Sequence, residues 1–107
     1  MSNIGYIDNA LRSEAIGLLD LTKDDLVIRP NPFTENPTIS YRLATTGRAQ
    51  LRVSDAQGRA MGTLLDAGMR EGQHTMVWNT TGMAAGTYWL TLTLDGDRIT
   101  EQAVKVE

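Results

Sequence analysis

Apolar and polar residues alternate at every second position along most of the chain after residue 25. Alternation with a period of two is typical of a β-strand that buries one face and exposes the other. The clearest case is residues 87–97, where large apolar side chains face one way and Trp89 and the threonines face the other. Runs of this kind, separated by turns, predict seven short strands at residues 25–29, 38–43, 49–55, 60–66, 74–80, 87–97 and 98–106.

Seven short strands with no helix between them indicate an all-β fold, an immunoglobulin-like antiparallel β-sandwich. Residues 55–59 and 95–97 are expected to be tight turns, with Gly58 free to adopt a positive φ. The alternation predicts a core that contains Ile39, Tyr41, Leu51, Val53, Trp78, Leu90 and Leu92.

Two stretches depart from simple alternation. Residues 67–73 and 80–86 each contain two glycines and are expected to be loops. In the last strand the alternation slips between Ile99 and Val104, which predicts a β-bulge.

All three prolines of the chain lie between residues 30 and 37. Proline has a fixed φ and no amide donor, so no helix can pass this stretch, and we expect an extended kink at a sheet edge. The chain therefore divides into a linker or short helix at residues 1–25 and a β-sandwich at residues 26–107. A weak helical stripe in the first part consists of Leu11, Ala15, Leu18 and Leu19.

The composition narrows the class of protein. A chain of 107 residues suggests one domain, and without cysteine it has neither disulfides nor a thiolate metal site. The formal net charge of −3 lies wholly in residues 1–25, so a nucleic-acid interface is not expected. The first residues lack the pattern of a signal peptide, and no apolar run is long enough to span a membrane.

Candidate chemistry is sparse. His74 is the only histidine and lies on an alternating strand, where a structural role is more common than catalysis. Asp95 and Asp97 flank Gly96 and could contact a cation, although a hairpin turn explains them better. Asn79 begins a glycosylation tripeptide that also suits a polar strand end. We therefore expect no catalytic, cofactor or metal site and no enzymatic activity.

Three separated stretches together resemble a known family. They are residues 29–43, residues 51–92 and the final residues 99–107. This combination resembles the type A C-terminal sorting domain of the type IX secretion system of Bacteroidetes-type bacteria. The marks of the resemblance, and its candidate recognition residues, are Pro30, Asn31, Pro32, Asp55, Gly58, Arg59, Gly86, Tyr88, Lys105 and Val106. The related Ig-like domain of the flagellar hook-capping protein shares the proline stretch and the strand that begins at Gly86.

The resemblance implies a function. Such domains fold as a seven-stranded sandwich at the C-terminus of a cargo protein and direct it through an outer-membrane translocon. A sortase-like peptidase then removes the domain, here within residues 1–25, or joins the cargo to the cell surface. The protein would be a monomer without cofactors, transiently periplasmic and finally secreted or on the cell surface.

The last strand is a candidate for contact with a partner. Trp89 faces away from the core row of its strand, so it either packs against a loop or the linker, which is the more common outcome for an aromatic residue, or is exposed to a partner. The last strand is expected at a sheet edge, where unpaired amides and carbonyls are offered to a partner. The chain departs from the family at its end, where Glu107 follows Lys105 and Val106, whereas the family's ending is usually more basic. The alternative function is a non-catalytic Ig-like stalk or adhesion module of an extracellular protein.

Overall fold

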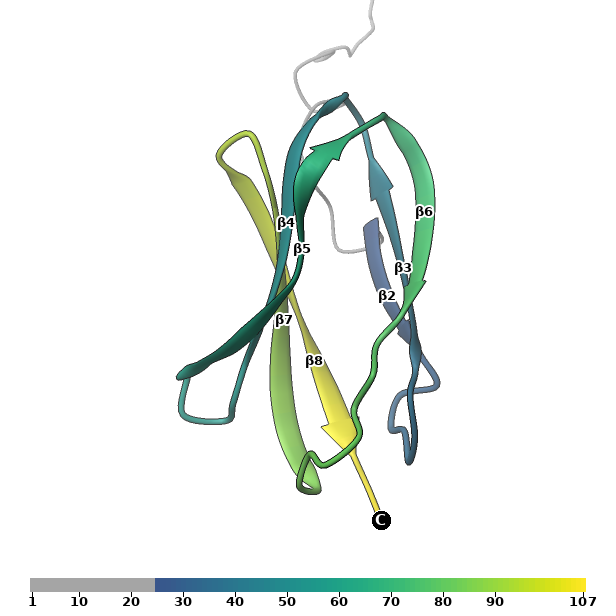
Figure 1. Cartoon of the computed structure of the whole chain (residues 1–107), viewed down its shortest axis with the longest axis vertical. Helices are drawn as coiled ribbons and strands as arrows, with labels where there is room; N and C mark the ends of the chain where they lie inside the picture. Colours follow the sequence, from purple (N-terminus) through teal and green to yellow (C-terminus); the bar gives the residue numbers. More distant parts are fainter. Residues whose placement is uncertain (1–24) are drawn as a thin grey trace, which may run out of the picture.

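The computed structural model describes residues 25–107, so the expected linker or short helix at residues 1–25, with its helical stripe, lies almost wholly outside the described residues. The described part is an all-β fold of seven antiparallel strands (Figure 1), which confirms the predicted fold class. The strands are β2 (Leu26–Arg29), β3 (Thr38–Leu43), β4 (Gly47–Ser54), β5 (Ala60–Met69), β6 (Gly72–Val77), β7 (Gly86–Leu94) and β8 (Asp97–Lys105).

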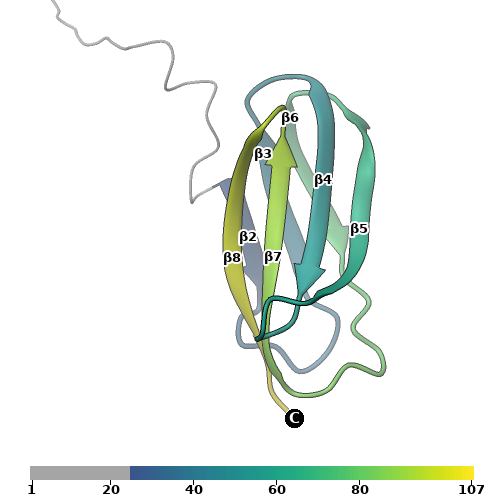
Figure 2. The same cartoon turned by 90° about the vertical axis from the view of Figure 1, so that its left-hand side faces the viewer.

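The strands form two sheets that pack face to face (Figure 2). One sheet has the strand order β2-β3-β6 and the other the order β5-β4-β7-β8. Strand β2 contacts β8 across the layers. One long side of the sandwich is therefore bounded by β2 and β8, and the opposite side by β5 and β6; we call them the β2/β8 side and the β5/β6 side.

The core lies between the sheets and contains every residue that the alternation predicted. Each of these seven side chains is at most 3% exposed. Cross-strand pairs such as Leu51 with Leu92 and Val53 with Leu90 bring the inward faces of β4 and β7 together. Full burial of a side chain of this size contributes about 1.5–3 kcal/mol relative to exposure, so these pairs account for much of the stability of the sandwich.

The expectation of a loop at residues 67–73 is wrong. Strand β5 continues to Met69 and β6 begins at Gly72, so only Arg70 and Glu71 connect the two sheets there. Gly68, which suggested the loop, pairs with Arg48 in the ladder between β4 and β5. Pairing with a neighbouring strand outweighs the low strand preference of glycine at this position.

The expectation of a bulge in the last strand is also wrong. Strand β8 pairs with β7 without interruption from Gly86 opposite Lys105 to Leu94 opposite Asp97. The apparent slip arises because Glu101, opposite the buried Leu90, occupies an inward position, whereas Val104 faces outward. The register shifts of this fold lie instead between β4 and β5.

The loops gather at two ends of the sandwich. At the lower end in Figure 1 lie the loop after β2, the hairpin between β4 and β5, the loop between β6 and β7, and the C-terminus. The turn between β7 and β8 lies at the opposite end, where Asp95 and Gly96 have φ of 49° and 90°. The tight turn expected at residues 95–97 is therefore present.

Candidate functional site

The side chain of Asn31 joins the proline stretch to the last strand. Its Nδ2 donates to the carbonyl of Gln102 at 2.7 Å, and its Oδ1 accepts from the amide of Val104 at 3.0 Å. One amide side chain thus takes the place of a short piece of strand beside β8. The flanking Pro30 and Pro32 are exposed, and both of their preceding peptide bonds are cis.

Phe33 continues this pairing with its backbone. Its amide donates to the carbonyl of Val104 at 2.8 Å, and its carbonyl accepts from the amide of Val106 at 2.8 Å, which forms a short parallel bridge. Its ring is 1% exposed and lies 5.4 Å from the ring of Trp78. We call Asn31 and Phe33, with their four hydrogen bonds to Gln102, Val104 and Val106, the clasp.

The clasp corrects the expectation that the last strand is an open edge. Strand β8 does lie at the edge of its sheet, but the clasp pairs its outward-facing groups from the Gln102 carbonyl to the Val106 amide. In an antiparallel ladder, alternate residues turn their amides and carbonyls outward. The open part of this edge is therefore confined to Arg98, Thr100 and the amide of Gln102.

Gly86, Tyr88 and Lys105 meet in the ladder beside the clasp. Gly86 pairs with Lys105, and Tyr88 pairs with the fully buried Ala103. Gly86 has a φ of 153°, which L-residues rarely adopt. The Tyr88 hydroxyl donates to the carbonyl of Ala84, so this side chain anchors the loop before β7. Val106 is 40% exposed and is the most accessible apolar residue of this group.

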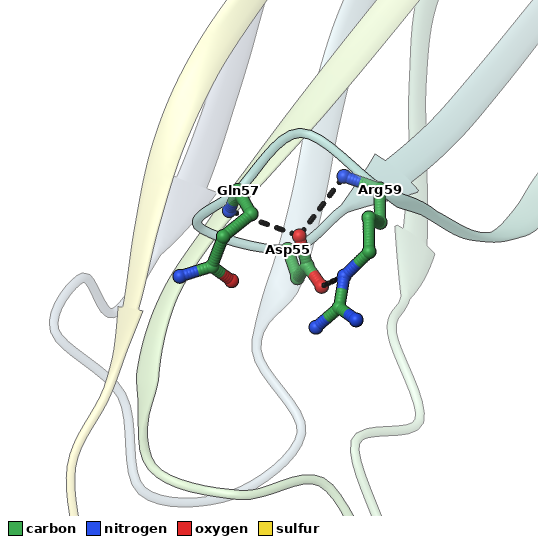
Figure 3. A network of polar contacts seen from close by, with 3 residues as sticks. All are labelled: Asp55, Gln57 and Arg59. Carbon is green, nitrogen blue, oxygen red and sulfur yellow. Dashed lines mark hydrogen bonds and ion pairs between the residues drawn. The ribbon is translucent and has the colours of Figure 1, made fainter.

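Asp55, Gly58 and Arg59 form a separate hairpin (Figure 3). The Asp55 carboxylate accepts hydrogen bonds from the amides of Gln57 and Arg59, each at 2.9 Å, and from Arg59 Nε at 2.8 Å. The amide of Arg59, followed by its guanidinium and the amide of Gln57, lowers the pKa of Asp55 from its ordinary value. Gly58 has a φ of 84°, as the sequence predicted, so these residues hold the turn in one shape.

The marks of the family resemblance belong to the loop after β2, the hairpin between β4 and β5, the start of β7 and the end of β8, and these elements lie toward the lower end of the sandwich in Figure 1. The marks nevertheless do not form one site. The clasp, Gly86 and Lys105 are contiguous through hydrogen bonds and pairing, whereas the bonds of Asp55 stay within its own hairpin. A shallow polar pocket of about 140 Å³ adjoins the clasp and is lined by Thr34, Glu35, Asn36, Thr80, Thr81, Gly82 and Lys105.

Sequence reasoning missed two residues that hold this end together. Phe33 is buried but was not predicted to lie in the core. The sequence feature that could have identified it is a single aromatic residue among prolines and polar residues. Asn36 was not singled out either. Its Oδ1 accepts hydrogen bonds from the amide of Thr80 at 2.8 Å and from the Thr80 hydroxyl at 3.2 Å. Thr80 is only 2% exposed, so these bonds satisfy polar groups that are buried from water.

The residues considered for chemistry have structural contacts. The His74 ring stacks on Tyr41 at a centroid distance of 5.2 Å, and its Nε2 lies 2.7 Å from the carbonyl oxygen of Arg70. Asn79 is exposed and accepts from the amide of Thr81 at 3.0 Å in a local turn. Among residues 25–107, no group of three or more His, Cys, Asp or Glu side chains could hold a metal ion.

Trp89 lies on the outer face of the four-stranded sheet, as its place in the alternation predicted. It pairs with Ser54 on β4 and Gln102 on β8 and is half-buried.

A search of residues 25–107 for an apolar helix of membrane-spanning length finds none.

One comparison with known proteins gives a match. A family model described as a secretion system C-terminal sorting domain matches residues 27–106. The match runs from β2 to Val106, the last residue that is hydrogen-bonded in the clasp. No curated protein matches the chain.

Proposed function

The chain belongs to the family of secretion system C-terminal sorting domains, and we propose that it is a transferable address that type IX secretion reads on a larger cargo protein. The family assigns a sorting role in secretion, export to the cell surface or medium, and interaction with the secretion machinery and an N-terminal cargo. One observation carries the proposal: the family match covers the whole sandwich and not a fragment of it.

The proposed partners are an outer-membrane translocon and a sortase-like peptidase. The translocon accepts the folded domain, and the peptidase cleaves in residues 1–25, which releases the cargo or joins it to the surface. We propose that the domain itself is non-catalytic, as sorting domains of this family generally are. In support, His74, the one histidine of the chain, contacts the ring of Tyr41 and the carbonyl of Arg70.

Limited proteolysis tests the division at residue 25. Leu26 and Ile28 are buried and pair with Tyr41 and Ile39. A stable fragment should therefore begin at or just before Leu26, because a cut beyond it removes the apolar residues of β2 from the core. Resistance of the intact chain, combined with unfolding of the shortened one, would make residues 1–25 part of the domain.

We propose that the translocon reads the end of the sandwich that carries the clasp. The candidate contacts are the side chains of Lys105 and Val106, since the backbone of this part of β8 is paired with Asn31 and Phe33. Removal of residues 102–107 is a poor test, because it also removes the buried Ala103 and the partners of the clasp. Lys105→Ala and Trp89→Ala alter partly exposed side chains and leave the backbone pairing in place.

The deciding experiment fuses residues 1–107 to a neutral reporter and measures surface delivery in hosts with and without the translocon. Delivery should require both the domain and the translocon. Lys105→Ala should reduce delivery at unchanged melting temperature, with Thr93→Ala on the outer face of β7 as the matched surface control. Normal delivery without the domain, or in the translocon-deficient host, would end the sorting proposal.

The half-buried Trp89 supports a second candidate, the stalk or adhesion module. A tryptophan on the outer face of a sheet, beside polar side chains such as Gln102, provides a flat amphipathic surface for a partner. This candidate predicts translocon-independent binding to glycans or to a neighbouring domain, lost in Trp89→Ala.

A further inference from the structure

The outer face of the four-stranded sheet, which is turned toward the viewer in Figure 2, concentrates positive charge. The outward positions of β4, β7 and β8, which we call the basic face, hold no Asp or Glu and three arginines, Arg48, Arg52 and Arg98. Over the sandwich as a whole, basic and acidic residues are equal in number. Asp97 and Glu101 of β8 pair with buried leucines and belong to the inward row. The two signs of charge are therefore segregated.

Two arginines of the basic face have no acidic partner in the described part of the chain. Arg48 is paired with Asp66 on β5, whose Oδ1 lies 2.8 Å from Arg48 Nη2. Neither Arg52 nor Arg98 forms an ion pair with an acidic residue among residues 25–107, and both are exposed. A guanidinium group binds a carboxylate through two parallel hydrogen bonds, so these two side chains are suited to an external carboxylate.

Trp89 and two threonines lie among these arginines. Arg52 pairs with Thr91, two residues beyond Trp89 on β7, so Trp89 and Arg52 are diagonal neighbours about 7–8 Å apart. Thr91 in turn pairs with Thr100, two residues from Arg98 on β8, and the hydroxyl oxygens of the two threonines are 3.0 Å apart. The basic face thus combines an indole ring, hydroxyl groups and guanidinium groups on adjacent strands.

The backbone of the basic face cannot receive a further strand over most of its width. Strands β4 and β7 are the inner strands of their sheet, and each is paired on both sides. Because the amides and carbonyls of an inner strand are used within the sheet, a polypeptide laid across this face gains no main-chain hydrogen bonds there. Recognition must come from side chains that bind anions, hydroxyl groups and flat apolar surfaces. This favours a polymer rich in hydroxyl and acidic groups over an extended peptide.

We propose that the basic face binds an acidic polysaccharide, a polymer of sugar rings that carry carboxylate groups. The indole of Trp89 stacks on the apolar face of a sugar ring. Arg52 and Arg98 bind carboxylates, and Thr91 and Thr100 bind hydroxyl groups. The inference rests on the second candidate function, the adhesion module, and not on the sorting role.

Charge complementarity selects this occupant over two others. A neutral polysaccharide would satisfy the indole and the hydroxyl groups but would leave the guanidinium groups of Arg52 and Arg98 without an anion. A nucleic acid requires a larger excess of positive charge than a chain with a formal net charge of −3 offers. An acidic polysaccharide supplies apolar ring faces, hydroxyl groups and negative charge in one polymer.

The test titrates polygalacturonate into the full chain at low ionic strength and follows binding by NMR. The expected result is a shift of the indole N–H of Trp89 and of the Nε–H groups of Arg52 and Arg98. The fully methyl-esterified form of the same polymer keeps the sugar rings without the negative charge and should bind at least about tenfold more weakly. Added salt should weaken binding, because exposed charges are screened beyond about 8 Å at physiological ionic strength.

Two double variants separate the basic face from the overall charge of the chain. Arg52→Gln combined with Arg98→Gln should lower the affinity at least about tenfold at unchanged melting temperature. Arg29→Gln combined with Arg70→Gln removes the same charge from exposed residues at the end of β2 and after β5. This control should keep the affinity within about twofold of wild type. Trp89→Ala should lower the affinity as well.

Three results would each overturn the proposal. The first is the absence of binding to the full chain, whether because the basic face has no affinity or because residues 1–24 cover it. The second is equal affinity for the methyl-esterified polymer, and the third is an equal loss of affinity in the two double variants. No secretion machinery is present in this assay, so none of these results bears on the sorting proposal, and failed reporter delivery would leave the polysaccharide proposal standing.

Discussion

The two long sides of the sandwich are closed in different ways. On the β2/β8 side, Asn31 and Phe33 pair with the outer edge of β8, and the Phe33 ring fills the space between the sheets. On the β5/β6 side, β5 extends beyond β6 and leaves partly buried apolar side chains and free backbone groups. Among residues 25–107, the clasp therefore pairs part of the edge of β8, whereas no strand pairs with the edge of β6.

The residues that mark the family resemblance and the unpaired backbone of β6 lie on different sides of the sandwich. Pro30, Asn31, Gly86 and Lys105 belong to the closed β2/β8 side, where they hold the local shape. The open side consists of residues that no motif singles out, such as Gln73 and Thr75. A motif thus identifies where the fold is constrained, whereas accessibility follows from the unequal widths of the two sheets.

Phe33→Ala should break the closed side and have the largest effect. The ring is fully buried against Trp78, so its removal should lower the free energy of unfolding by about 3–5 kcal/mol. Met61→Ala is the matched change on the open side, where half of the side chain is already exposed, and should cost less than about 1 kcal/mol. Urea unfolding measures both, and equal costs would contradict the comparison.

Leu90→Ala should weaken both sides together. Leu90 is fully buried at the centre of β7, between the two sides, and its truncation should cost about 2–5 kcal/mol. Hydrogen exchange should accelerate at the clasp and along β6 alike. Thr93→Ala, on the outer face of the same strand, is the control and should cost less than about 1 kcal/mol. Acceleration on one side alone would mean that Leu90 does not join them.

Asn31→Ala should open the clasp without unfolding the domain. It removes two hydrogen bonds to β8, with an expected cost of about 1–2 kcal/mol and faster exchange of the Val104 amide. Asn31→Asp retains an acceptor for Val104 but has no donor for the Gln102 carbonyl, so it should fall between wild type and Asn31→Ala. Unchanged exchange at Val104 in both variants would show that the clasp does not protect β8.

The Asp55 hairpin lies on neither side and should give the smallest effect. The pKa of Asp55 is lower in the folded chain than its ordinary value, so its contribution to stability is present above that value and is lost as pH falls through the folded pKa. The difference in unfolding free energy between wild type and Asp55→Asn should therefore shrink as pH falls from about 5 to about 2. A constant difference over this window would contradict the hydrogen bonds of the hairpin.

Sequence patterns predicted the parts of this fold that depend on local alternation. Ile39, Leu51 and Leu90 were identified as core residues because burial on one face of a strand imposes a period of two. The last strand was misinterpreted because Glu101 takes an inward position that the pattern assigns to an apolar residue. Polar residues at partly open edge positions carry no periodic signal.

The clasp could not be predicted for a different reason. Its side-chain hydrogen bonds join residues 71 and 73 positions apart in the sequence, and a single Asn between two prolines does not specify its partner. The unpaired edge on the β5/β6 side could not be predicted from sequence patterns either. It follows from a sheet of four strands lying over a sheet of three, which is a property of topology and not of any one residue.

The parallel direction of the clasp has a mechanical consequence. Strand β2 and Phe33 run in the same direction as β8, from the upper to the lower end in Figure 1. A force that pulls the N-terminal side of the domain one way and its C-terminus the other therefore acts along the two parallel segments. The hydrogen bonds of Phe33 to Val104 and Val106 are then loaded in shear, both at once, and do not open one after the other. Resistance to forced unfolding depends on the rate of unfolding, so the clasp acts as a tension-bearing joint between the two ends of the domain.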